Sequence, residues 1–159
     1  MSEILWIDSD KGAMPYLNEL KKELDKSFVK HSLFYTSSTR EACNLFIGLG
    51  KKELAGIVIG FDFIDCELRE VVSALTNGKK ESYFFNEGGW LLYKCIRNYD
   101  KEKPVVLLGS LDADTDFLLT HGLVSADPYM HFISRKLDGV YDLTACAIMK
   151  FVFKKVYWE

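Results

Sequence analysis

Five short runs of mainly apolar residues recur along the chain, and longer stretches with a different spacing of apolar positions separate them. Several of the runs are almost purely apolar, which is typical of strands buried on both faces of a parallel sheet. The predicted strands are Ile4–Ile7, Lys30–Tyr35, Gly56–Phe61, Val105–Leu108 and Met130–Ser134.

The stretches between these runs place apolar residues three or four positions apart, which predicts helices. Hydroxyl side chains at 36–39 offer an N-cap to the second helix. Gly48 and Gly50 are expected to weaken the end of that helix. The predicted helices are Met14–Ser27, a helix that begins at about Arg40, Trp90–Arg97, Asp114–His121 and Asp138–Tyr157.

Strict alternation of five strands with five helices predicts an α/β fold with helices on both faces of a parallel sheet. Right-handed crossovers favour a flavodoxin-like, doubly wound sheet of five parallel strands in the order 2-1-3-4-5. In such a sheet, functional residues gather at the carboxyl ends of the strands. Those ends are predicted at Asp8–Asp10, Gly60–Asp65, Gly109–Ser110 and Arg135–Lys136.

Composition narrows the class of protein. The chain has 159 residues, 48% of them hydrophobic, and a net charge of −3, which suits one domain over 1–159. Lysines occur in pairs and never in runs, so we expect no contact with nucleic acid. Early charges at Asp8, Asp10 and Lys11 do not fit a signal peptide, and no stretch is apolar enough to cross a membrane. A cytoplasmic protein is therefore expected.

Enzymatic chemistry has little support. The cysteines show no metal-binding spacing, the histidines are scattered, and neither a phosphate-binding glycine loop nor a nucleophile motif is present. We therefore expect a protein that is not an enzyme.

Five segments resemble the receiver domain of bacterial response regulators, the signalling unit of two-component systems. The first strand is followed by acids, as in that family, and the other segments match its second helix, third helix, fourth strand and fifth strand. The resemblance covers nearly the whole chain. The segments are Ile4–Asp10, Thr36–Phe46, Gly89–Arg97, Pro104–Ser110 and Phe132–Lys136.

The resemblance implies a phosphorylation pocket in which an aspartate after strand three accepts the phosphoryl group. Acids after strand one would hold a divalent cation, while a lysine after strand five and a hydroxyl after strand four would bind the phosphate. An aromatic residue on strand five would carry the signal, and this sequence has Phe132 at that position.

Most other pocket positions depart from the family pattern, which predicts a degenerate pocket, or pseudo-receiver. Gly60 stands at the phosphoacceptor, and glycine has no side chain to phosphorylate. The remaining departures are Ser9 in place of the second acid, Gly109 in place of the hydroxyl residue, Arg135 in place of the lysine and Lys136 in place of the proline. Asp10 follows directly after Ser9, and Ser110 follows directly after Gly109.

These departures leave alternatives for individual residues. Asp8 and Asp10 are candidate Mg²⁺ ligands, but without a third carboxylate we expect no bound metal and no cofactor. Asp62 would become an alternative phosphoacceptor if strand three extends beyond Gly60. Arg135 suits either an anionic ligand or an ion pair with one of these acids.

Two segments point to contact with a partner. An insertion at about 63–87, between strand three and helix three, carries three consecutive aromatic residues that either cover the pocket or meet another protein. The last helix has a second apolar stripe, which predicts a protein partner or a homodimer. The interface candidates are Tyr83, Phe84, Phe85, Cys146, Met149, Phe153 and Tyr157.

The leading hypothesis is an atypical receiver-like signalling module that acts by protein–protein interaction, independently of aspartyl phosphorylation. A first alternative is an atypical receiver that is phosphorylated on Asp62. A second is a flavodoxin-like domain that binds a small anionic ligand at Arg135 and Lys136.

Overall fold

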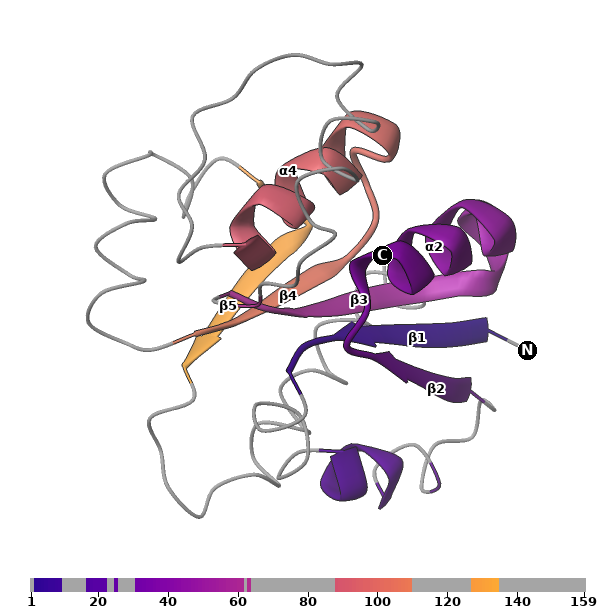
Figure 1. Cartoon of the computed structure of the whole chain (residues 1–159). Coiled ribbons are helices and arrows are strands. Elements are labelled where there is room, and N and C mark those ends of the chain that lie inside the picture. Colours follow the sequence, from indigo (N-terminus) through magenta and orange to yellow (C-terminus); the bar gives the residue numbers. More distant parts are fainter. Residues whose placement is uncertain are drawn as a thin grey trace.

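A computed structural model describes residues 2–9, 17–22, 25, 31–61, 63, 88–109 and 127–134 (Figure 1). The described part contains five strands and two complete helices, and residues 17–22 form helical turns. The elements are β1 (Ser2–Ile7), β2 (His31–Thr36), α2 (Thr39–Glu53), β3 (Leu54–Gly60), α4 (Gly88–Tyr99), β4 (Val105–Gly109) and β5 (Met130–Ser134).

The five strands form one parallel sheet in the order β2-β1-β3-β4-β5, which confirms the predicted flavodoxin-like topology. The register aligns Ile7 with Ile59 and Gly60 with Leu108. Because all strands point the same way, the carboxyl ends of β1, β3 and β4 meet at one edge of the sheet. The amino ends of β3, β4 and β5 meet at the opposite edge.

Alternate residues of the central strands face two separate cores. Leu5, Ile57 and Leu107 belong to a core beneath α2 and α4, whereas Trp6 and Val58 belong to a core on the other face. Figure 1 shows α2 and α4 on one face of the sheet and the helical residues 17–22 on the other. The central strands β3 and β4 are therefore buried on both faces, as their apolar composition predicts.

Helix α2 continues through two glycines near its end. Its start is as expected, since the Ser38 hydroxyl accepts a hydrogen bond from Glu41 N at 3.2 Å. Gly48 and Gly50 do not end the helix, which continues to Glu53, and β3 follows at once. Each glycine costs about 1 kcal/mol of helix propensity. Burial of the inner face of α2 against the sheet outweighs that cost.

Other predicted segments lie outside the described residues. These are the helices 114–121 and 138–157 and, apart from Phe63, the insertion at about 63–87. Among the helices that the structure does describe, none is long and apolar enough to cross a membrane.

Candidate functional site

Asp8, the first residue after β1, is almost completely buried, with 1% of its surface exposed. Its carboxylate accepts a hydrogen bond from Trp6 Nε1 at 3.3 Å and another from Ser9 N at 2.8 Å. Its backbone is held too, because Asp8 N donates to Thr36 O and the Tyr35 hydroxyl donates to Asp8 O. Both carboxylate oxygens of Asp8 therefore serve as acceptors for groups of the protein itself.

Gly60 is the last residue of β3 and lies at the edge of the sheet where the predicted pocket would be. Phe61 N still donates to Leu108 O at 2.7 Å, but Phe63 N donates back to Gly60 O at 3.0 Å. This second bond closes a turn, so the strand does not extend beyond Gly60. The extension that would carry Asp62 into the pocket is absent, while Asp62 itself lies outside the described residues.

The start of α4 packs directly on the end of β3. Gly89 N donates to Phe61 O at 3.1 Å, and a Cβ on Gly89 would lie 1.8 Å from Gly60 O and 2.7 Å from Gly60 C. No real Cβ approaches a backbone atom so closely, so only glycine fits at position 89. The two glycines thus bring helix and strand into backbone contact beside the predicted acceptor position.

Phe132, the retained aromatic residue of β5, packs towards the same edge. Its ring meets the fully buried ring of Phe61 edge to face, with centroids 6.2 Å apart. The ring centroids of Phe61 and Trp90 lie 6.3 Å apart, and those of Trp90 and Tyr93 lie 5.2 Å apart. A continuous row of aromatic rings therefore leads from β5 along the inner side of α4.

The structure brings together only part of the predicted pocket. Asp8, Gly60 and Gly109 lie at the ends of adjacent strands β1, β3 and β4, as the topology predicts. Among the described residues, no group of three or more His, Cys, Asp or Glu side chains is placed to hold a metal ion. The predicted site residues outside the described ranges are Asp10, Asp62, Ser110, Arg135 and Lys136, together with the interface candidates Tyr83, Phe84, Phe85, Cys146, Met149, Phe153 and Tyr157.

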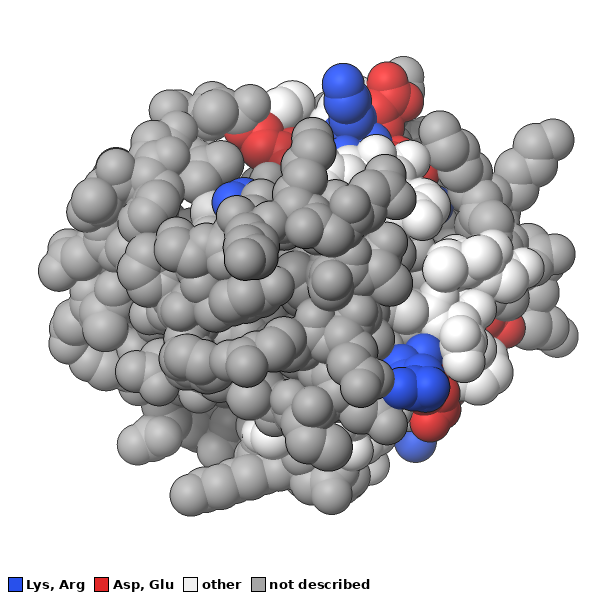
Figure 2. Space-filling view, turned by 45° about the horizontal axis from the view of Figure 1, so that its top comes forward, with Lys and Arg blue, Asp and Glu red and all other residues white. Residues whose placement is uncertain are grey.

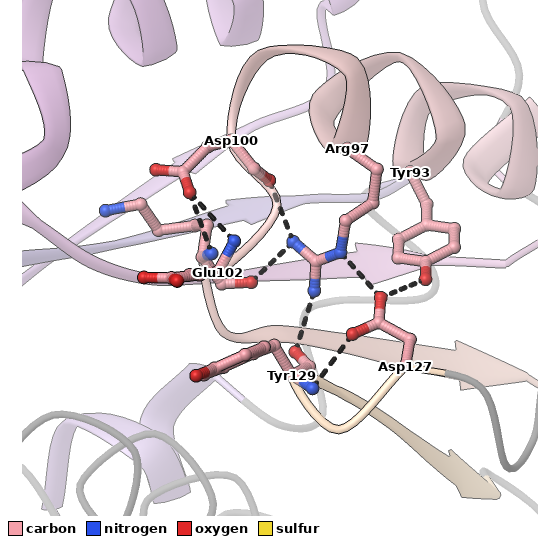
Figure 3. Close-up of polar contacts among 7 residues, drawn as sticks. Tyr93, Arg97, Asp100, Glu102, Asp127 and Tyr129 are labelled. Carbon is pink, nitrogen blue, oxygen red and sulfur yellow. Dashed lines mark hydrogen bonds and ion pairs between the residues drawn. The ribbon is translucent and has the colours of Figure 1, made fainter.

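A second polar cluster, which sequence reasoning missed, lies at the opposite edge of the sheet (Figure 3). Arg97, near the end of α4, donates from Nε to Asp127 Oδ2 at 2.6 Å. Its other nitrogens donate to the backbone oxygens of Lys103 at 2.6 Å, Tyr129 at 2.9 Å and Asp100 at 3.3 Å. One guanidinium therefore joins α4, the turn before β4 and the segment before β5.

Asp127 is the anionic centre of this cluster. Its Oδ2 also accepts from the Tyr93 hydroxyl, and its Oδ1 accepts from Tyr129 N at 2.9 Å. Burial by itself would raise the pKa of Asp127, but the hydrogen bonds from Arg97, Tyr93 and Tyr129 N outweigh it and lower that pKa. Burial, and next the bond to Asp127, raise the pKa of the Tyr93 phenol.

Asp100 and Lys103 complete the turn before β4. The Asp100 carboxylate accepts from the backbone nitrogens of Glu102 at 3.0 Å and Lys103 at 3.1 Å. The buried Lys103 ammonium reaches across to β3 and donates to Leu54 O at 2.5 Å. One local signal for the cluster was available, because Asp127-Pro128 is a typical turn dipeptide.

Charged residues on the described part of the face in Figure 2 form small groups in which blue and red residues lie near one another. The described part of that face has no broad area of one sign. Electrostatic recognition there would have to depend on a few individual side chains.

The fold is similar to that of a solved structure, the response regulator receiver domain from Rhodospirillum rubrum. The two share 14% sequence identity with a TM-score of 0.57, over 97% of this chain and 94% of that chain. No family model matches the sequence, and neither does any curated protein. The structural similarity shows that the chain has the fold of a receiver domain.

Proposed function

We propose that the protein is a receiver-like signalling module that acts through protein–protein contact without aspartyl phosphorylation. The receiver fold supports the general class. The observation that carries the rest is Gly60 at the end of β3, where the resemblance to receivers requires the phosphoacceptor aspartate. A glycine there offers no carboxylate for phosphoryl transfer.

The surroundings of Gly60 add support. Its carbonyl accepts from Phe63 N, and the backbone of Gly89 approaches it too closely for any side chain at position 89. Asp8, at the end of the adjacent strand β1, is buried and hydrogen-bonded to Trp6 and Ser9. A hydrated Mg²⁺ ion would have to compete with those donors for the same carboxylate.

We further propose that the protein is cytoplasmic and needs no cofactor. A partner protein or a second copy of this chain would contact its last helix. The stripe Cys146, Met149, Phe153 and Tyr157 is the surface proposed for that contact. Sedimentation equilibrium of the wild type and of a Phe153→Ser variant tests it. We expect self-association in the wild type, or complex formation with a candidate partner, to be lost in the variant, whereas an unchanged state would contradict this surface.

The phosphorylation claim is tested by incubating the protein with acetyl phosphate and Mg²⁺ and measuring its intact mass. Tryptophan fluorescence on addition of beryllofluoride gives a second measurement. We expect neither a phosphoryl mass increase nor a fluorescence change, while an active receiver domain under the same conditions shows both. Stoichiometric modification that disappears in an Asp62→Ala variant would overturn the proposal and establish a receiver phosphorylated on Asp62.

A further inference from the structure

Two readily oxidised side chains of α4, an indole and a phenol, lie in contact. The ring centroids of Trp90 and Tyr93 are 5.2 Å apart, with 37° between the ring planes. Both residues are buried, with 3% of the surface of each exposed. Beyond Trp90 the row continues with Phe61, and a phenylalanine ring is much harder to oxidise. Within the described row of rings, Tyr93 is therefore the side chain that can return an electron to an oxidised Trp90.

The phenol of Tyr93 is already bonded to a proton acceptor. Its hydroxyl donates to Asp127 Oδ2, the same oxygen that accepts from Arg97 Nε at 2.6 Å. Burial, and next the bond to Asp127, raise the pKa of the Tyr93 phenol, so the proton stays on the phenol while the ring is reduced. A phenol that has lost an electron is a strong acid. The hydrogen bond to Asp127 then gives its proton a direct route to a carboxylate.

The Tyr93 end of this pair faces the solvent side of the molecule. Tyr93 and Asp127 line an open groove beside the C-terminal half of α4, together with Pro128 and Tyr129 from the segment before β5. Trp90 lies at the start of the helix, in the core beneath it. A positive charge on the indole would be poorly solvated in that core. Solvation therefore favours movement of the oxidation from Trp90 to Tyr93 and Asp127.

We infer that Tyr93 is a redox-active tyrosine that reduces oxidised Trp90, with Asp127 as the proton acceptor. A one-electron oxidant first removes one electron from the Trp90 indole, which becomes a radical cation. Tyr93 then gives one electron to Trp90 while its O–H bond breaks, and the proton forms a new O–H bond with Asp127 Oδ2. The products are a neutral indole, a neutral phenoxyl radical and a protonated carboxyl group, and the oxidant keeps the removed electron. The inference is independent of the proposed function, because neither a phosphoryl group nor a partner takes part.

The test is transient absorption after a laser flash that ejects an electron from tryptophan, with a cobalt(III) ammine complex present to capture that electron. The decay of the indole radical and the rise of the phenoxyl radical are followed together. A Trp158→Phe background removes the tryptophan that lies outside the described residues. In this background Trp90→Phe is compared with Trp6→Phe, because Trp6 lies in the core on the other face of the sheet.

Three further variants separate the electron donor from the proton acceptor. Tyr93→Phe removes the donor, and Asp127→Asn replaces the base by an amide of similar shape. Asp100→Asn is the matched control, because the Asp100 carboxylate lies at the same edge of the sheet but bonds to the backbone nitrogens of Glu102 and Lys103. Circular dichroism verifies that each variant is folded. Heavy water gives a second measurement that needs no substitution at Asp127, because a step that moves a proton is slower in it.

We expect the phenoxyl radical to rise as the indole radical decays, and to be lost in Trp90→Phe and Tyr93→Phe but kept in Trp6→Phe. Asp127→Asn should slow the rise at least about tenfold, and Asp100→Asn by less than about twofold. Heavy water should slow the rise as well. Absence of the rise, its survival in Tyr93→Phe, equal rates in the two asparagine variants, or a rate unchanged in heavy water would overturn the inference.

Discussion

Replacement of Arg97 by alanine removes a side chain that joins α4 to the segments before β4 and β5, at the edge of the sheet opposite to Gly60. Four hydrogen bonds are lost, to the carboxylate of Asp127 and to the backbone oxygens of Lys103, Tyr129 and Asp100. The contact of the guanidinium with the Tyr93 ring, 5.3 Å from its centroid, is lost as well. The Asp127 carboxylate keeps its negative charge but loses the positive guanidinium that pairs with it.

The expected cost follows from the burial of the pair. Breaking a fully buried ion pair costs about 3–5 kcal/mol, because the remaining charge stays in a poorly solvated place. Arg97 and Asp127 keep 14% and 12% exposure, so water compensates in part and we expect a loss of about 3 kcal/mol. That is a large share of a total stability on the order of 10 kcal/mol. Arg97→Lys should cost about 1–2 kcal/mol, because a single ammonium cannot reproduce the fork of donors.

Urea unfolding, followed by tryptophan fluorescence, measures these changes. Trp6 and Trp90 are both buried and report on the two cores. The midpoint for Arg97→Ala should fall by about 1–2 M. As a control, Lys22→Ala removes an exposed ion pair with Glu19 and should change stability by less than about 0.5 kcal/mol.

A double-mutant cycle isolates the pair itself. Arg97→Ala combined with Asp127→Ala should cost less than the sum of the single variants, with a coupling free energy of about 1–3 kcal/mol. A loss of stability in Arg97→Ala that matches the Lys22→Ala control, or two single effects that simply add, would refute a stabilising Arg97–Asp127 pair.

Three further predictions concern other positions. Gly89→Ala should destabilise the protein by more than about 2 kcal/mol in chemical denaturation, because the new Cβ would lie 1.8 Å from Gly60 O. As a control, Gly48→Ala should stabilise the protein by about 0.5–1 kcal/mol, because a Cβ there meets nothing within 4 Å. Similar effects of the two substitutions would contradict the close approach of Gly89 to Gly60. The folded-state pKa of Asp127 lies below its usual 3.8, so its stabilising contribution is present above pH ~4 and is lost as pH falls through the folded pKa. Urea titrations between about pH 5 and 2 should show a smaller acid loss of stability in Asp127→Asn than in wild type, and parallel curves would argue against it. Asp8→Ala should lower the urea midpoint by the equivalent of about 1–3 kcal/mol, because two hydrogen bonds lose their acceptor; an unchanged midpoint would show that those bonds contribute nothing.

Part of the candidate site followed from the sequence because it depends on strand ends. The apolar runs and the crossover rule placed Asp8, Gly60 and Gly109 on adjacent strands, and the structure brings those ends together. Whether Asp8 is open to a ligand could not be predicted. Its burial depends on where Trp6 Nε1 and Ser9 N point, and residue spacing contains no such information.

The Arg97 cluster shows the limit of pattern reading most clearly. Arg97 reads in the sequence as an ordinary basic residue near a helix end, and Asp127 as a turn residue. Their pairing spans 30 positions, and the bond of Lys103 to Leu54 spans 49. Such contacts depend on how β3, β4 and β5 align side by side.

The sequence by itself determined the alternation of strands and helices, the sheet order and the absence of an acid at position 60. Those features rest on local periodicity and on residue identity, both of which are present before the chain folds. Only the tertiary structure decided that α2 continues through its glycines, that Gly89 touches Gly60, and that Arg97 holds Asp127. Each of these depends on burial and on groups distant in sequence, whose free energies arise only when the sheet and helices pack together.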